Sequence, residues 1–90
     1  MNKLFSESAF DEYKEWALED KKTWKRINDL IKDIERNGID EGIGQPEALK
    51  HGFSGYWSRR IINGHRLIYN IDDKNKTLFI ISCKGHYLKK

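Results

Sequence analysis

The feature that most limits how this chain can fold is Asn63-Gly64, which separates two β-rich runs at residues 56–62 and 65–72. Both residues of the pair tolerate the positive φ angles of a two-residue turn, so the pattern predicts an antiparallel β-hairpin. A polar segment at residues 73–76 then leads into a third β-rich run at 77–83. The C-terminal half is therefore predicted to form an antiparallel meander.

The N-terminal half predicts two amphipathic helices. Ser6 is a suitable N-cap for a helix over about residues 7–19, and Asp20 can cap a second helix that ends at Asn37-Gly38. Because the turn between the helices is very short, we expect them to lie antiparallel. Lys3-Leu4-Phe5 has the composition of a short strand. Apolar residues recur at helical spacing in both segments: Phe10, Tyr13, Trp16 and Ala17 in the first, and Trp24, Ile27, Leu30, Ile31 and Ile34 in the second.

These elements predict a single α+β domain over residues 1–90, with two N-terminal antiparallel helices packed on a twisted antiparallel β-sheet. The one cysteine, Cys83, excludes an internal disulfide, and with three histidines it fits no closed zinc pattern, so we predict no metal and no cofactor. No apolar run reaches the roughly 18 residues of a membrane span, and the N-terminus lacks the apolar core of a secretion signal. We therefore expect a cytoplasmic protein that does not contact a membrane.

Charge is unevenly distributed along the chain. Residues 1–47 carry eight Lys and Arg against twelve Asp and Glu, a balance of −4, whereas residues 48–90 carry nine against two, a balance of +7. All three histidines also fall in the basic half. This asymmetry favours a surface that binds a polyanion such as RNA, although it could also serve solubility alone.

Two arginines are expected to share the open face of the hairpin. A two-residue turn at Asn63-Gly64 pairs Ile61 with Arg66, which places Arg59 on the same face as Arg66 and Arg60 on the opposite one unless a bulge intervenes. A slip of one residue would exchange Arg59 and Arg60. An arginine pair on an exposed face could hold a phosphodiester by bidentate contacts, or it could be an ordinary feature of a strand surface.

Groups suited to acid–base chemistry lie in two other segments. The long loop expected at residues 38–55 contains the carboxylate Glu47 and two candidate RNA-binding cations, Lys50 and His51, and the last strand leads to His86-Tyr87. Cleavage of RNA needs a base for the 2′-hydroxyl, cations for the phosphorane and an acid for the departing 5′-oxygen, and needs no metal. Each of these residues also has an ordinary structural interpretation, so composition and spacing alone do not establish an enzyme.

At these residues the chain resembles the YoeB family of bacterial toxins, within the RelE-like superfamily of messenger-RNA interferases. The similarity is nearly chain-wide and specific as a set. It rests on Ser6-Glu7 with Asp11, Tyr13 and Trp16, and on the segments 25–33, 46–51, 54–61, 65–69 and 83–87. The resemblance implies the RelE-like fold of two helices over a twisted antiparallel sheet, and a ribonuclease that acts on translated mRNA in the ribosomal A site. The expected products carry a 2′,3′-cyclic phosphate and a 5′-hydroxyl.

The resemblance also implies roles for individual residues. Glu47 would be the general base, Arg66 the main transition-state cation, His86 the general acid and Tyr87 a positioning or stacking residue. Lys50 and Arg60 match positions associated with the substrate phosphates, so the family pattern favours Arg60 where the predicted register favours Arg59.

The implied partners are mRNA on the ribosome, a YefM-like antitoxin that neutralises the toxin, and a second copy in a homodimer, with operator DNA contacted only through the antitoxin complex.

Two departures from the family pattern are the extension Leu88-Lys89-Lys90 and Ala48 at a position where proline is common. The alternative function is a non-catalytic module that binds RNA or an antitoxin with the same basic face.

Overall fold

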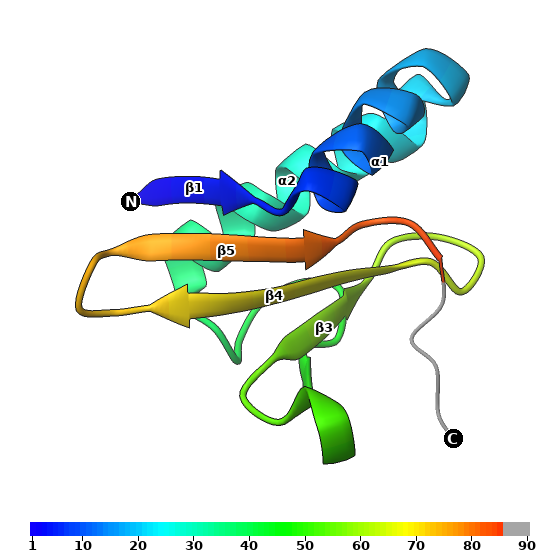
Figure 1. Cartoon of the computed structure of the whole chain (residues 1–90). Coiled ribbons are helices and arrows are strands. Elements are labelled where there is room, and N and C mark those ends of the chain that lie inside the picture. Colours follow the sequence, from blue (N-terminus) through cyan, green and yellow to red (C-terminus); the bar gives the residue numbers. More distant parts are fainter. Residues whose placement is uncertain (86–90) are drawn as a thin grey trace.

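The computed structural model describes residues 1–85 and confirms the predicted α+β architecture. Within this range two helices pack together over one face of a five-stranded sheet (Figure 1). The elements follow one another as β1 (Asn2–Phe5), α1 (Glu7–Glu19), α2 (Lys21–Asn37), β2 (Glu47–Ala48), η1 (His51–Phe53), β3 (Trp57–Arg60), β4 (Arg66–Asp72) and β5 (Thr77–Ser82). None of the helices within residues 1–85 has the length and apolar character needed to cross a membrane.

The helices begin and end where the capping residues predicted. The Ser6 hydroxyl accepts a hydrogen bond from the backbone N–H of Ala9 at 3.0 Å, which starts α1. Asp20 separates the helices: its carboxylate accepts from the N–H of Thr23 at 3.3 Å and so caps α2. Gly38, with a φ of 98°, ends α2. Each cap satisfies backbone groups that a helix end would otherwise leave without partners.

The sheet is mixed, whereas the prediction was wholly antiparallel. Its strand order is β1-β5-β4-β3-β2, and every neighbouring pair is antiparallel except β1 with β5, which is parallel. The two helices and strands β2 to β4 lie between β1 and β5 in the sequence. A connection of this length allows β5 to run beside β1 in the same direction. The predicted long loop at residues 38–55 also contains two short elements, β2 and η1.

The register between β3 and β4 differs by one residue from the predicted register, because Arg60 lies opposite Arg66. The two-residue turn forms with positive φ at both of its residues, as predicted. However, the N–H of Ile61 donates to the carbonyl of His65 at 2.9 Å, and the N–H of His65 donates to the carbonyl of Ile62 at 2.8 Å. Two residues of one strand thus face one residue of the other, and this bulge shifts all preceding pairs by one.

The bulge turns Arg59 into the core, so its predicted place on the open face was wrong. Its partner across the strands is Leu67, on the face that packs on the helices, and its side chain is 0% exposed. Tyr69 also faces the core, whereas Phe10, expected in the buried stripe of α1, is 47% exposed. The buried apolar cluster consists of Ala9, Trp16, Ile27, Leu30, Ile31, Ile34, Ile61, Leu67, Tyr69, Leu78, Ile80 and Cys83.

Candidate active site

Polar side chains from three adjacent strands gather on the face of the sheet opposite to the helices. In the observed register Glu47 of β2 lies opposite Ser58 of β3, and Arg60 of β3 lies opposite Arg66 of β4. Because side chains alternate between the two faces of a strand, these four residues share one face, and Arg59 points to the other. The fold thus brings together three of the predicted site residues: Glu47, Arg60 and Arg66.

The closest pair in this group is Arg66 and Glu47. Nη1 of Arg66 lies 3.5 Å from Oε1 of Glu47 and 3.5 Å from the hydroxyl of Ser58. The Glu47 side chain is 67% exposed and that of Arg66 is 24% exposed. Both contacts are at the outer limit of hydrogen-bond distance, and the contact with Glu47 is open to water, so neither group is held tightly. A carboxylate that can accept a proton and a guanidinium that can turn to a phosphate thus lie side by side.

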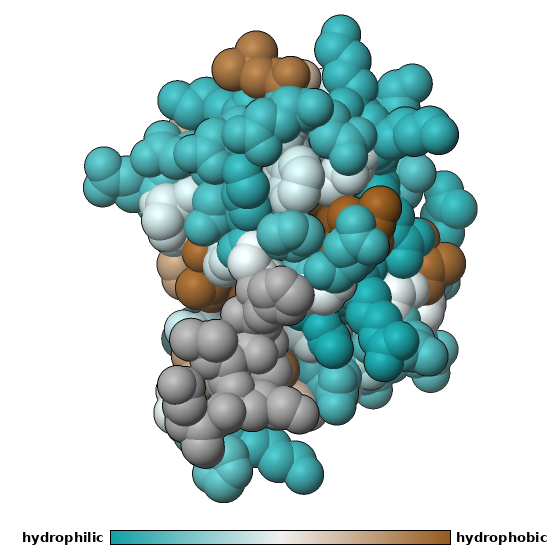
Figure 2. Space-filling view, turned by 90° about the vertical axis from the view of Figure 1, so that its right-hand side faces the viewer, coloured by the Kyte–Doolittle hydropathy of each residue, from teal (hydrophilic) through white to brown (hydrophobic). Residues whose placement is uncertain are grey.

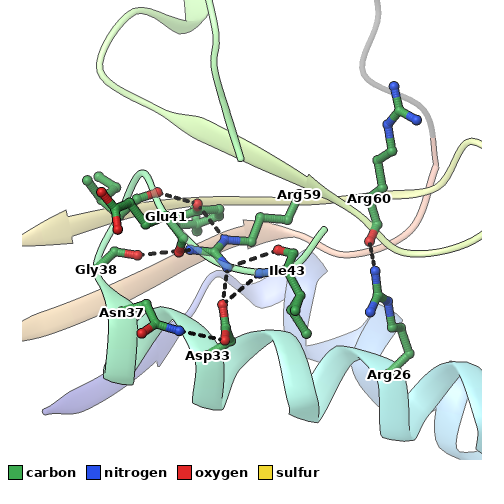
Figure 3. Close-up of polar contacts among 10 residues, drawn as sticks. Arg26, Asp33, Asn37, Gly38, Glu41, Ile43, Arg59 and Arg60 are labelled. Atoms are coloured by element: carbon green, nitrogen blue, oxygen red, sulfur yellow. Dashed lines mark hydrogen bonds and ion pairs between the residues drawn. The ribbon is translucent and has the colours of Figure 1, made fainter. Parts of the chain in front are cut away.

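Arg60 is exposed, but its backbone is held on both sides. Its N–H donates to the carbonyl of Gly44 at 2.7 Å, and its carbonyl accepts from Nη2 of Arg26 at 3.1 Å. Its side chain extends away from α2 and from Arg26 (Figure 3). Residues 60–66 of the hairpin line a pocket of about 460 Å³, so Arg60 and Arg66 both border one concave surface. Such a surface suits an anionic group that takes charge-assisted contacts from two sides.

The other predicted cations of the loop lie beyond β2. Lys50 is exposed and directly precedes η1, and His51 is the exposed first residue of η1 with a φ of 61°. Within residues 1–85 the structure pairs neither side chain with Glu47 or Arg66. These cations flank the cluster and do not belong to it.

The predicted acid His86 and its neighbour Tyr87 lie outside the described residues. The last residue described, Gly85, is bonded on both sides to the start of β4: its N–H donates to Nδ1 of His65 at 2.7 Å, and its carbonyl accepts from the N–H of Arg66 at 3.1 Å. The chain therefore reaches Gly85 next to the backbone of Arg66. His65, to which no role was assigned from the sequence, is the residue that Ile61 and Ile62 face at the bulge, and its imidazole holds the backbone of Gly85.

Helix α1 holds the segment that leads to Gly85. The indole N–H of Trp16 donates to the carbonyl of Cys83 at 2.8 Å, and the carboxylate of Glu12 accepts from the N–H of Cys83 at 2.8 Å. Nζ of Lys84 lies 2.9 Å from Glu15 and 3.0 Å from Glu19. Burial raises the pKa of the Cys83 thiol to about 12, so this thiol stays protonated at neutral pH. Its side chain packs in the buried apolar cluster.

Much of the surface near the helix ends is polar. Figure 2 shows the side of the molecule at the right of Figure 1, where hydrophilic side chains predominate and hydrophobic areas are small and separated.

Across residues 1–85, no group of three or more His, Cys, Asp or Glu side chains is arranged to hold a metal ion.

Comparison with known proteins identifies relatives that match nearly the whole chain. A family model described as the YoeB-like toxin of bacterial type II toxin-antitoxin systems matches residues 5–87. The curated Toxin YoeB of Escherichia coli K12 is 47% identical over 87 residues, which is 97% of this chain and 100% of that protein. Two solved Staphylococcus aureus structures, a heterotetrameric YoeB-YefM toxin-antitoxin complex and a YoeB dimer, each superpose with a TM-score of 0.89 at 52% identity, over 97% of this chain and 98% of theirs. The chain therefore belongs to the YoeB-like toxins of bacterial type II toxin-antitoxin systems.

Proposed function

We propose that this toxin is a ribosome-dependent endoribonuclease that cleaves mRNA in the A site without a metal. The observation that carries the proposal is the cluster on the open sheet face, where Glu47 lies 3.5 Å from Arg66 and Arg60 lies directly across the strands from Arg66. A base next to two cations is the arrangement that attack by a 2′-hydroxyl on its own 3′-phosphate requires.

In this mechanism Glu47 takes the proton of the 2′-hydroxyl, and the 2′-oxygen attacks the adjacent phosphorus. Arg66, with Arg60 on the same phosphate, stabilises the negative charge that develops on the phosphorane oxygens. The bond from phosphorus to the 5′-oxygen breaks, and His86 donates a proton to that oxygen while Tyr87 positions or stacks on the substrate. One product ends in a 2′,3′-cyclic phosphate and the other begins with a 5′-hydroxyl.

The exposure of Glu47 suggests why the ribosome is needed. A carboxylate that is open to water is a weak base toward a hydroxyl, because water stabilises its charge. The decoding site would order the message against the open face and exclude water, so that Glu47 meets the 2′-hydroxyl in a drier and more fixed geometry. Free RNA should therefore be a poor substrate, and the toxin would act in the cytoplasm, where translation takes place.

The proposed protein partners follow from the relatives. A YefM-like antitoxin would neutralise the toxin, as the S. aureus complex suggests, and a homodimer would form, as the S. aureus dimer suggests. The basic half of the chain suits an acidic, partly disordered antitoxin segment that folds as it covers the open face. Operator DNA would be contacted only through that complex.

The test maps 5′-hydroxyl ends on a short message in a reconstituted translation system, with wild type beside Glu47→Ala. We expect wild type to cut within the A-site codon in the presence of ribosomes and Glu47→Ala to leave the message intact. Glu41→Ala is the matched control, because it removes an exposed carboxylate from the segment between α2 and β2 and keeps the backbone.

Binding measured on the same proteins separates the enzyme from a binding module. Loss of a carboxylate should not weaken contact with phosphates, so Glu47→Ala should still bind programmed ribosomes. Unchanged message with wild type, together with intact binding, would contradict the catalytic proposal and favour the non-catalytic alternative.

A further inference from the structure

A fully buried arginine lies directly beneath the candidate active site. Counted within residues 1–85, the guanidinium of Arg59 donates five hydrogen bonds, one for each of its N–H groups (Figure 3). Its acceptors are the hydroxyl of Tyr69 at 2.9 Å, the carboxylate of Asp33 at 2.6 Å, and the carbonyls of Ile43 at 3.0 Å, Gly38 at 2.9 Å and Glu41 at 2.6 Å. The side chain thus ties β3 to α2, to β4 and to three points of the connecting segment 38–44.

Asp33 holds the same segment from the side of α2. Its Oδ2 accepts both from Nη1 of Arg59 and from the backbone N–H of Ile43 at 2.9 Å, and its Oδ1 accepts from the side chain of Asn37 at 2.8 Å. Burial is the largest influence on the pKa of Asp33 and raises it, but the hydrogen bonds from Arg59, Ile43 and Asn37 together outweigh burial and lower the pKa below its ordinary value. The carboxylate is therefore ionised at neutral pH and paired with Arg59.

The segment 38–44 is closely packed against this ion pair. A side chain at Gly42 would collide with the carboxylate of Asp33, and one at Gly44 would come within 2.8 Å of Leu30 and 3.1 Å of Arg59. Both glycines have positive φ. The hydroxyl of Tyr69, which accepts from Arg59, donates in turn to the carbonyl of Ile39 at 2.6 Å. The path of the segment is thus set by polar contacts and by the absence of side chains at two positions.

This buried network adjoins the candidate active site in two places. Arg59 lies between Ser58 and Arg60 on β3, so its inward side chain anchors the strand whose neighbouring residues face outward. The carbonyl of Gly44, at the end of the held segment, accepts from the N–H of Arg60 at 2.7 Å. Glu47 follows three residues later on a strand of two exposed residues, which has little burial of its own to hold it.

We infer that the Asp33–Arg59 ion pair is a positioning device for catalysis: it fixes the segment 38–44 and thereby sets the Glu47 carboxylate and Arg60 relative to Arg66. The inference rests on the proposed function. Neither Asp33 nor Arg59 touches the substrate; both act through residues that do.

The test compares Asp33→Asn and Arg59→Lys with wild type. Asp33→Asn removes the charge and keeps the size, and Arg59→Lys keeps the charge but loses the five-donor fork. Ile34→Val is the matched control, because it disturbs a buried neighbour on α2 without touching the network. Each protein is assayed at a temperature at which it is folded, by amide hydrogen exchange over residues 38–48 and by cleavage of ribosome-bound message under saturating and limiting conditions.

We expect faster exchange in residues 38–48 of both network variants and a fall in kcat of about 10- to 100-fold, since small misplacements of catalytic groups have effects of this size. KM should change less than kcat, because Arg66 is not held by the pair and Arg60 is displaced but not lost, whereas Ile34→Val should keep wild-type kcat. Arg59→Lys should retain more activity than Asp33→Asn if the pair's charge holds the segment.

Other outcomes would overturn the inference. Exchange that stays at the wild-type rate would show that the ion pair does not hold the segment. Faster exchange with unchanged kcat would show that the segment does not position Glu47 and Arg60. Failure of wild type to cut ribosome-bound message would instead refute the proposed function, and with it any catalytic role for the pair. The exchange comparison would still decide whether the pair holds residues 38–48.

Discussion

Replacement of the buried arginine by an apolar residue of similar length, Arg59→Met, should destabilise the fold severely. The change leaves the Asp33 carboxylate, which is 15% exposed, without its cation, and three carbonyls without their donor. Removing one partner of a buried ion pair costs about 3 to 5 kcal/mol. For a domain of 90 residues the whole stability is about 5 to 14 kcal/mol, so about a fifth or more would be lost. The melting temperature should fall by about 12 to 40 °C.

Urea unfolding, followed by the fluorescence of the three tryptophans, measures this loss. Lys3→Met is the control, because it breaks the exposed ion pair between Lys3 and Glu35, and exposed pairs contribute about 0 to 1 kcal/mol. The double variant Asp33→Asn with Arg59→Met should lose less than the sum of the two single variants, since each removes the same interaction. A loss for Arg59→Met no larger than that for Lys3→Met would refute the reasoning.

Three further predictions concern other parts of the molecule. The pKa of Asp33 is lowered from its ordinary value of 3.8, so the ionised carboxylate stabilises the fold above that pH. This contribution is lost as the pH falls through the lower pKa of the folded state. In acid unfolding curves, the free energy of unfolding should therefore fall less steeply for Asp33→Asn than for wild type over that range. Cys83 should react with thiol reagents at pH 8 only as fast as the protein unfolds, because its thiol is buried and its pKa is raised to about 12; rapid labelling of folded protein would contradict this. Gly44→Ala should cost about 2 to 5 kcal/mol by left-handed strain and overpacking, whereas Gly52→Ala, where a Cβ meets no atom within 4 Å, should be nearly neutral in the same urea titration.

The sequence was most informative where local chemistry decides the structure. Ser6, Asp20 and Gly38 bound the two helices as predicted, because capping depends on a few neighbouring residues. The turn at Asn63-Gly64 also formed as predicted. These features predicted most of the architecture, and the composition of residues 3–5 predicted the strand β1. The parallel pairing of β1 was not predicted, because it depends on contacts with β5 that are distant in sequence.

The candidate active site was predicted less completely, because its geometry depends on one bulge. A two-residue turn sets the register only if no extra residue follows it, and nothing in the turn itself indicated the bulge. The stripe of Trp57, Arg59 and Ile61 did carry a signal: two of its three members are apolar, which favours the core face for all three. Arg59 could thus have been assigned to the interior. Its partners in the segment 38–44 could not, because backbone carbonyls leave no trace in the sequence.

The most direct test of the central claim changes the substrate and leaves the protein intact. A ribosome-bound message is prepared with a single 2′-deoxynucleotide on the 5′ side of the bond that wild type cuts, and cleavage is compared with that of the all-ribose message. If the 2′-oxygen is the nucleophile, the substituted bond should stay intact while the all-ribose message is cut to a 2′,3′-cyclic phosphate and a 5′-hydroxyl. Cleavage of the substituted bond at the same rate would contradict the mechanism assigned to Glu47 and Arg66.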